Sequence, residues 1–327
     1  MLIISNYHYI RDDFSARYPS VFGLTPAQFR KQLEELSRHG EFISLEKLLE
    51  FQHRPLDRNY ILISFDDGLK EQYELAKPIL DEMGVPAAFF INTSNFKEKI
   101  VSLVHKIHLL RSEISSHEIL SELQKKGTAP LSEKEKTLAI THYNYDEAET
   151  ALLKYLLNFK MVLPEQQAFI DPLFEQIFDE HQVNSALYMD KEMLQALHGQ
   201  GYLGSHSHRH LPLGQVDPEV LQEELKNTQD FFRSNFGKPS AAISYPYGSF
   251  EASTGISEAI EKAEFSLGFT MERAANKDLQ EDSLLLSRFD CNDLPGGKND
   301  LFKGQHIFKN PELRKWHKNE SSIPHKR

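Results

Sequence analysis

Short apolar runs alternate with longer amphipathic stretches along most of this 327-residue chain. The runs are rich in aliphatic and aromatic side chains, which is typical of buried β-strands. We predict seven strands, at residues 2–5, 60–65, 87–91, 202–205, 241–245, 267–270 and 284–289.

Helices are predicted between these strands, and two of them have a recognisable first turn. Thr25 supplies an N-cap, Pro26 suits the first helical position, and Gln28 completes a capping box. Asp217 and Pro218 begin another helix in the same way. Alternation of strand and helix with short connections predicts an α/β fold, and about seven parallel strands suit a distorted (β/α) barrel.

One interval, residues 96–188, contains no convincing strand. Its apolar side chains recur at helical spacing among many charges, so we predict a helical insertion. The domain organisation that follows is a barrel of residues 1–95 and 189–300, the insertion 96–188 and a C-terminal tail, 301–327. The apolar residues that these inserted helices are expected to bury are Leu152, Leu153, Leu156, Leu157 and Phe159.

Composition and charge restrict the class of protein. A net charge of -11 argues against a nucleic-acid partner, because binding phosphates needs a basic surface. No apolar stretch is long enough for a transmembrane segment. The single cysteine, Cys291, cannot form an internal disulfide, and the chain opens without a signal-peptide pattern, so we expect a cytoplasmic protein. The oligomeric state stays open.

Two adjacent carboxylates, Asp66 and Asp67, follow the predicted strand 60–65 and precede Gly68. Sheets of α/β proteins place their sites at the carboxyl ends of strands. The pair by itself is equally consistent with a turn that caps a helix.

Three histidines, His206, His208 and His210, follow the predicted strand 202–205. On a helical turn His206 and His210 project from one side and can share a metal, whereas in an extended segment all three share a face. A lone buried histidine is usually a hydrogen-bonded core residue. Three within five residues are hard to explain by packing, so we expect a metal-binding or catalytic role.

These segments resemble the motifs of the polysaccharide deacetylases, carbohydrate esterase family 4. Ser64-Phe65-Asp66-Asp67-Gly68 is similar to their T/S-F-D-D-G motif, and the segment from His206 to His210 is similar to H-S/T-x-x-H. Tyr245-Pro246-Tyr247-Gly248 resembles the end of the third motif. The resemblance covers residues 1–95 and 189–295. It implies a hydrolase that removes the N-acetyl group from an amino sugar in a saccharide or glycan precursor.

The resemblance also implies roles for these residues. Asp67, His206 and His210 would hold one divalent metal, most commonly Zn²⁺, and three protein ligands with an open position are typical of catalytic zinc. Asp66 would be the general base that takes a proton from water. The substrate pocket and the backbone donor for the oxyanion would come from Tyr245, Pro246, Tyr247 and Gly248.

Two parts of the family pattern are missing here. The arginine expected two residues before the proline is replaced by Ser244, so we expect Arg288 to hold Asp66 ionised, although a surface arginine is the alternative. The late L-x-x-H motif, which supplies the general acid, is absent. Tyr7-His8 resembles the opening of a circularly permuted branch of the family, which makes His8 the expected acid, with His208 and His306 as alternatives.

Other classes of function also fit a metal site on this fold. A non-catalytic carbohydrate-binding protein is one alternative, but a binder needs no base beside its metal. A deformylase or an amidase acting on another amide is a second. A metal-dependent phosphoesterase is a third, although such enzymes more often use two metals and more ligands.

Overall fold

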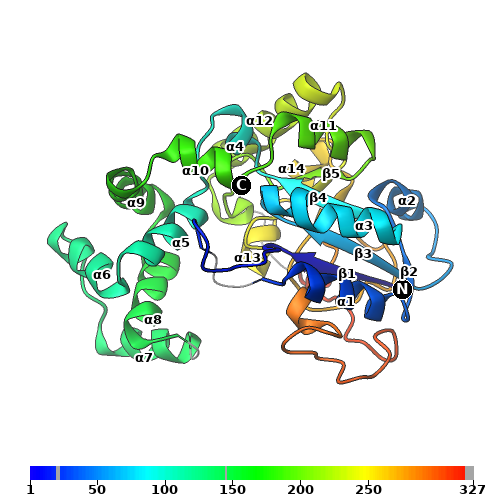
Figure 1. The fold of residues 1–327 in the computed structure, drawn as a ribbon, viewed down its shortest axis with the longest axis horizontal. Helices are drawn as coiled ribbons and strands as arrows, with labels where there is room; N and C mark the ends of the chain where they lie inside the picture. Colours follow the sequence, from blue (N-terminus) through cyan, green and yellow to red (C-terminus); the bar gives the residue numbers. More distant parts are fainter. Residues whose placement is uncertain (20–22, 144–145, 321–327) are drawn as a thin grey trace. The chain divides into compact units, whose positions relative to one another are not determined.

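The computed structural model describes residues 1–19, 23–143 and 146–320 (Figure 1). Its central sheet has the strand order β7-β6-β5-β4-β3-β1-β8, with β2 pairing with β3 off this path. Every pairing between these strands is parallel. The strands are β1 (Leu2–Tyr7), β2 (Glu41–Phe42), β3 (Tyr60–Phe65), β4 (Ala87–Ile91), β5 (Leu203–Ser205), β6 (Ala242–Ser244), β7 (Leu267–Phe269) and β8 (Phe289–Asp290).

The predicted α/β barrel-like fold is confirmed, since seven parallel strands curl into a half-barrel surrounded by helices. The prediction for residues 284–289 was too long. Leu286 forms an isolated parallel bridge to Phe269 of β7, and only Phe289 onward pairs with β1. This segment bridges to β7 at Leu286 and then pairs with β1, so neither pairing extends into a long ladder. The sequence analysis missed β2, because two residues show no alternation.

Helices cover the sheet, and two of them begin where the sequence predicted. The capping box of Thr25 and Gln28 is present at the start of α1 (Pro26–Leu36). Pro218 is the first residue of α12 (Pro218–Phe236). The other helices around the sheet are α2 (Leu45–Leu49), α3 (Lys77–Met83), α4 (Thr93–Lys97), α11 (Lys191–Gly199), α13 (Phe250–Ser253), α14 (Ser257–Lys262) and α15 (Trp316–Glu320), with single turns η1 (Glu50–Gln52), η2 (Gln72–Ala76), η4 (Leu213–Gln215) and η5 (Cys291–Asp293).

The chain divides into two compact units. The first consists of Met1–Phe14, Phe22–Ile100 and Asn184–Arg327, and it carries the whole sheet. The second consists of Ser15–Val21 and Val101–Val183. Its described residues are largely helical: α5 (Leu103–Glu113), α6 (Ser116–Lys125), α7 (Glu133–His142), α8 (Ala148–Tyr155), η3 (Leu156–Lys160), α9 (Leu163–Ile177) and the start of α10 (Glu180–Leu187).

The expected burial of the inserted helices holds for most of the apolar residues. Leu153, Leu156 and Leu157 are buried and Leu152 is half-buried. The expectation for Phe159 was wrong, since its side chain is 54% exposed. Phe159 lies in η3, a π-helical turn, and the extra residue in such a turn rotates the following side chains away from the buried face.

Side chains of the strands alternate between two apolar clusters. Ile3, Ile61 and Ile63 pack outward, in the cluster that contains Phe29 and Leu33 of α1. The inward cluster contains Leu2, Ile4, Leu62, Phe90 and Phe269. Both faces are buried, which explains why the strands are continuously apolar. Within the described residues, no helix has the length and apolar content needed to cross a bilayer.

Candidate active site

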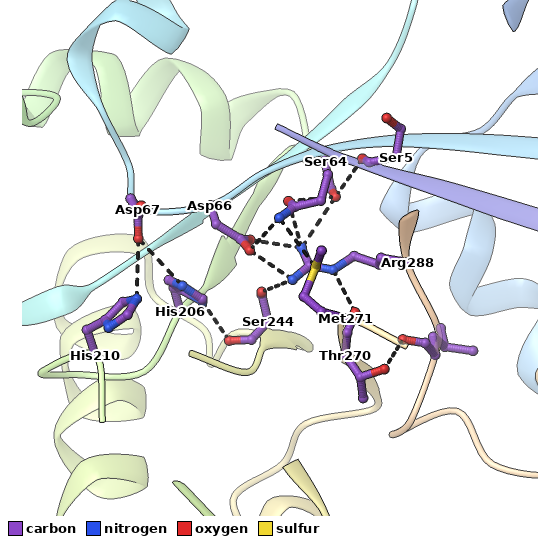
Figure 2. Close-up of polar contacts among 12 residues, drawn as sticks. Ser5, Ser64, Asp66, Asp67, His206, His210, Ser244, Thr270, Met271 and Arg288 are labelled. Atoms are coloured by element: carbon purple, nitrogen blue, oxygen red, sulfur yellow. Dashed lines mark hydrogen bonds and ion pairs between the residues drawn. The ribbon is translucent and has the colours of Figure 1, made fainter. Parts of the chain in front are cut away.

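The inward-facing row of side chains becomes polar at the carboxyl ends of the strands. On β1 the row runs Leu2, Ile4, Asn6, and on β3 it runs Leu62, Ser64, Asp66, because every second residue faces the same side. Ser244 of β6 joins them through a contact with Arg288. The apolar interior therefore ends in a layer of small polar groups and one carboxylate (Figure 2).

Asp66 is buried in this layer and is held by an arginine from a distant part of the chain. Arg288 donates from Nη1 to Oδ1 of Asp66 at 2.9 Å and from Nη2 to Oδ2 at 2.8 Å. The Arg288 side chain is completely buried, so the alternative of a surface arginine is excluded. The structure brings together the two residues that the sequence analysis expected to pair, in the bidentate geometry typical of arginine and carboxylate.

The other donors of Arg288 are also satisfied by this layer. Nη1 contacts Oδ1 of Asn6 at 2.9 Å, and Nη2 donates to Oγ of Ser244 at 2.8 Å. Nε donates to the carbonyl of Thr270 at 3.1 Å. A fully bonded guanidinium has a fixed orientation, and the carboxylate that it binds is fixed with it.

The surroundings of Asp66 keep it ionised. Burial by itself would raise the pKa of this carboxyl. The positive charge of Arg288 and its hydrogen bonds outweigh burial and lower the pKa of Asp66 to about 2. Asn6 adds a hydrogen bond from Nδ2 to Oδ2 of Asp66 at 3.1 Å.

Asp67 faces away from Asp66, toward the two histidines (Figure 2). Oδ1 of Asp67 lies 3.6 Å from Nε2 of His206 and 3.5 Å from Nε2 of His210. All three residues are buried, and their potential ligand atoms lie within 4.8 Å of one another. A tetrahedral zinc ion with ligands at about 2.0–2.2 Å separates neighbouring donor atoms by roughly 3.3–3.6 Å, so this group fits a divalent metal.

The protonation of His206 also suits a metal ligand. Nδ1 of His206 lies 2.8 Å from the main-chain carbonyl of Ser244, a group that only accepts hydrogen bonds. Nδ1 therefore carries a proton, and in the neutral ring Nε2 presents a lone pair toward Asp67. Second partners of this kind orient the imidazoles of metal-binding histidines.

His208 lies outside this group. Its Nδ1 is 2.8 Å from the hydroxyl of Thr93, at the start of α4, and its Nε2 is 3.3 Å from Glu98. Burial and the charges of Lys97 and Arg209 lower the pKa of His208 to about 4. The segment follows neither of the two regular geometries considered from the sequence, because Ser207 and His210 both have positive φ.

His8 follows β1, directly beside the strand that carries Asp66. The backbone N–H of Asp66 donates to the carbonyl of Tyr7 at 3.1 Å. Gln72 in the π-helical turn η2 donates from Nε2 to the carbonyls of His8 at 2.9 Å and of Asp66 at 2.6 Å. The side chain of His8 is half-buried. Gln72 therefore connects the ends of β1 and β3.

The third motif forms a tight turn after β6. Tyr245 is buried, and its hydroxyl donates to the carbonyl of Leu284 at 2.9 Å, so its side chain supports the turn from inside. The ring of Tyr247 is 49% exposed and lies edge-on to the ring of His210, with centroids 5.1 Å apart. Gly248 has a φ of +58°, and a Cβ there would lie 2.5 Å from Cγ of Met271, so only glycine fits.

Sequence reasoning missed Asn6, Ser64 and Gln72. A signal for the first two was present in the inward-facing row, since a polar residue in an otherwise apolar alternation needs a buried partner. His8 continues the row that begins with Leu2, Ile4 and Asn6. The role of Gln72 had no signal, because its position depends on the π-helical turn.

Comparison with known proteins identifies the family. The family model for polysaccharide deacetylases matches residues 53–155 and 170–268, more than half of the chain. The chain therefore belongs to the polysaccharide deacetylase family and is a hydrolase acting on amide bonds. No curated protein matches the sequence.

Solved structures show the same fold at low sequence identity. The Streptococcus pyogenes deacetylase PplD in complex with acetate is 16% identical with a TM-score of 0.52, covering 88% of this chain and 91% of that one. IcaB from Ammonifex degensii is 15% identical with a TM-score of 0.51, covering 88% and 91%. The de-N-acetylase from Aggregatibacter actinomycetemcomitans is 13% identical with a TM-score of 0.52, covering 89% and 95%.

Proposed function

We propose that this protein removes the N-acetyl group from an amino sugar in a saccharide or glycan precursor, in a reaction that depends on one divalent metal. The observation that carries the proposal is a pair of adjacent carboxylates in different surroundings. Asp66 is held ionised by Arg288, and Asp67 faces His206 and His210. A base beside a metal-binding group is the arrangement that hydrolysis of an amide needs.

Asp67, His206 and His210 would hold the metal. Two imidazole nitrogens and one carboxylate oxygen suit zinc, and leave positions for water and substrate. When bound, the ion lowers the pKa of water and polarises the amide carbonyl. The second partner of His206, the carbonyl of Ser244, keeps that ring in the tautomer that binds a metal.

Asp66 is the general base in this proposal. Its carboxylate accepts a proton from the attacking water, and the buried Arg288 keeps the carboxylate ionised and stationary. The ring of Tyr247 lies against His210, and in this proposal the backbone N–H of its turn stabilises the developing oxyanion. His8, at the end of the neighbouring strand, donates the proton that the departing amine requires.

The bonding of Asp66 favours catalysis over the carbohydrate-binding alternative. Burying a carboxylate and a guanidinium costs several kcal/mol per ion, and attraction between them only partly offsets that cost. A carbohydrate-binding protein has no use for Asp66, a second and ionised carboxylate next to the proposed metal ligand Asp67. Proton transfer gives this buried pair a use that sugar binding does not.

Acetate release tests the proposal directly. The zinc-loaded protein is incubated with N-acetylglucosamine oligomers, a nucleotide-linked N-acetylamino sugar and a lipid-linked N-acetylated saccharide, and acetate is measured enzymatically. N-formylated analogues of the same sugars test the deformylase alternative by formate release. Activity should be lost on chelation and return with zinc. Saccharide binding with no acetate or formate release from any substrate would favour the binding protein.

A further inference from the structure

Glu224, on α12, is a buried carboxylate that the proposed reaction does not use. Its side chain is completely buried. Oε2 accepts hydrogen bonds from the backbone N–H groups of His208 at 3.2 Å and Arg209 at 2.9 Å. Oε1 accepts from Nε of Arg209 at 2.6 Å. All three donors belong to the short segment between His206 and His210.

That segment needs support from outside itself. Ser207 has a φ of +67° and His210 a φ of +60°, a left-handed conformation that residues other than glycine keep only when the surrounding structure holds them there. No helix or strand spans residues 206–210, and the β4–β5 ladder ends at His206, whose N–H donates to the carbonyl of Ile91 at 2.7 Å. Inside it, the hydroxyl of Ser207 accepts from the N–H of His210 at 3.2 Å.

The start of α4 holds the opposite side of the segment. Thr93 donates its backbone N–H to the carbonyl of Ser207 at 3.1 Å, and Ser94 donates to the carbonyl of His208 at 3.0 Å. Glu224 accepts hydrogen bonds from the backbone N–H groups of His208 and Arg209. The backbone between the two histidines is therefore held by hydrogen bonds from α4 on one side and α12 on the other.

We propose that Glu224 is a positioning residue for the metal site. It fixes the backbone of residues 206–210, and through it the spacing of the His206 and His210 imidazoles in front of Asp67. This inference rests on the proposed metal-dependent function. A carboxylate suits the task because it accepts several hydrogen bonds in one place, and charge-assisted bonds are the stronger kind. Desolvating it is offset only while those three donors stay in place.

Zinc affinity of the whole 327-residue chain, measured by competition with a chromophoric chelator, tests this inference. Glu224→Gln keeps the shape of the side chain but replaces one acceptor oxygen by an NH₂ group that faces donors. The dissociation constant for zinc should rise about 10- to 100-fold, as for other residues that orient metal ligands. Hydrogen exchange at the backbone amides of His208 and Arg209 should become faster.

Glu272 offers a matched control. It is also buried, and it accepts from the backbone N–H groups of Lys315 at 2.6 Å and Trp316 at 3.2 Å, and from the Ser287 hydroxyl at 3.0 Å. Glu272→Gln therefore disturbs a similar buried carboxylate that bonds no part of the histidine segment. It should lower thermal stability and leave the zinc dissociation constant within about twofold of the parent.

The outcomes distinguish a failure of the role of Glu224 from a failure of the proposed metal-dependent function. A parent protein that binds no zinc overturns both the metal site and the role of Glu224. Tight binding by the parent, with equal dissociation constants for Glu224→Gln and Glu272→Gln, overturns the role of Glu224 alone. If Glu224→Gln does not fold, Glu224→Asp, which keeps the charge but shortens the reach, carries the same comparison. An unchanged zinc affinity of Glu224→Asp would also contradict the role of Glu224.

Discussion

Asp66 and Asp67 are neighbours in the chain, but their side chains lie in different environments. Asp66 continues the inward-facing alternation of β3 and meets Arg288. Asp67 has a φ of +78°, and this left-handed conformation turns its carboxylate out of the alternation and toward His206 and His210. One backbone torsion therefore gives two adjacent carboxylates two different sets of partners.

The two aspartates should respond differently to the same substitution. Asp66→Asn should keep zinc and lose about 10²- to 10⁴-fold in kcat, the usual contribution of a general base. Asp67→Asn should lose zinc and activity together. Metal content by atomic absorption and kcat by acetate release make the comparison. An Asp66→Asn protein as active as its parent would remove Asp66 from the mechanism.

Substitutions of the three histidines should also differ in their effect on bound zinc. His206→Ala or His210→Ala should reduce bound zinc well below one equivalent, because each removes one of three ligands. His208→Ala should leave zinc content nearly unchanged, since its ring contacts Thr93 instead of Asp67. Zinc analysis after dialysis gives the result. Equal loss in all three variants would show that the ligand set is different.

His8 should matter most when the leaving group needs a proton. His8→Gln should slow release of acetate from an N-acetylated sugar by about 10²- to 10⁴-fold. Hydrolysis of 4-nitrophenyl acetate by the same variant should change only a few-fold, because the nitrophenolate leaves without protonation. Zinc content and far-UV circular dichroism of the variant must match the parent. A similar loss with both substrates would instead indicate that His8 positions other groups, and attention would move to His208 or His306.

At the scale of elements, the cation that holds Asp66 comes from a different part of the chain than in the family pattern. In the family pattern an arginine stands at the position of Ser244, on β6. Here it comes from the segment before β8, and Ser244 accepts a hydrogen bond from it. The two positions therefore point into the same layer, and a cation on either element can reach the carboxylate.

Moving the arginine from position 288 to position 244 tests whether the two positions are equivalent. Arg288→Ser leaves Asp66 buried without its partner and should lower the free energy of unfolding by about 3–5 kcal/mol. Adding Ser244→Arg to that variant should recover part of both stability and kcat. Urea unfolding and acetate release measure the two effects. Ser244→Arg in the otherwise unchanged protein is the control, and it should be destabilised by two like charges in one layer. No recovery in the double variant would contradict the equivalence of the two positions.

At the scale of the molecule, the proposed metal site links β3 to the segment after β5. Asp67 follows one strand, His206 and His210 follow the other, and β4 lies between these strands in the sheet. A metal at this group therefore joins parts of the sheet-bearing unit that are far apart in sequence. Ligands that bind only the folded state stabilise it by mass action.

Removal of the metal should lower the thermal stability of the sheet-bearing unit. At a zinc concentration 100 times the dissociation constant, binding adds about 2.7 kcal/mol to the free energy of unfolding. Differential scanning calorimetry with and without chelator should show a lower Tm after chelation, restored by zinc. The His206→Ala protein should show no such shift. An equal shift in that variant would place the stabilising metal elsewhere.

The sequence by itself determined the class of fold and most of the members of the candidate site. Apolar runs of strand length and readable helix starts were sufficient, because burial on both faces and end capping act over a few neighbouring residues. The motifs around Asp67 and His206 carried the family resemblance for the same reason. Arg288 was expected only because the family's arginine was missing at Ser244.

Tertiary structure alone decided how distant segments meet. The full burial of Arg288 and its bonds to Asn6 and Ser244 depend on the curl of the sheet, which brings the segment before β8 beside β1 and β6. Glu224 had no signal, because a glutamate on an amphipathic helix is ordinarily a solvent-exposed residue. Its role follows from the backbone N–H groups of a segment with no secondary structure, and such groups find partners only when the chain has folded around them.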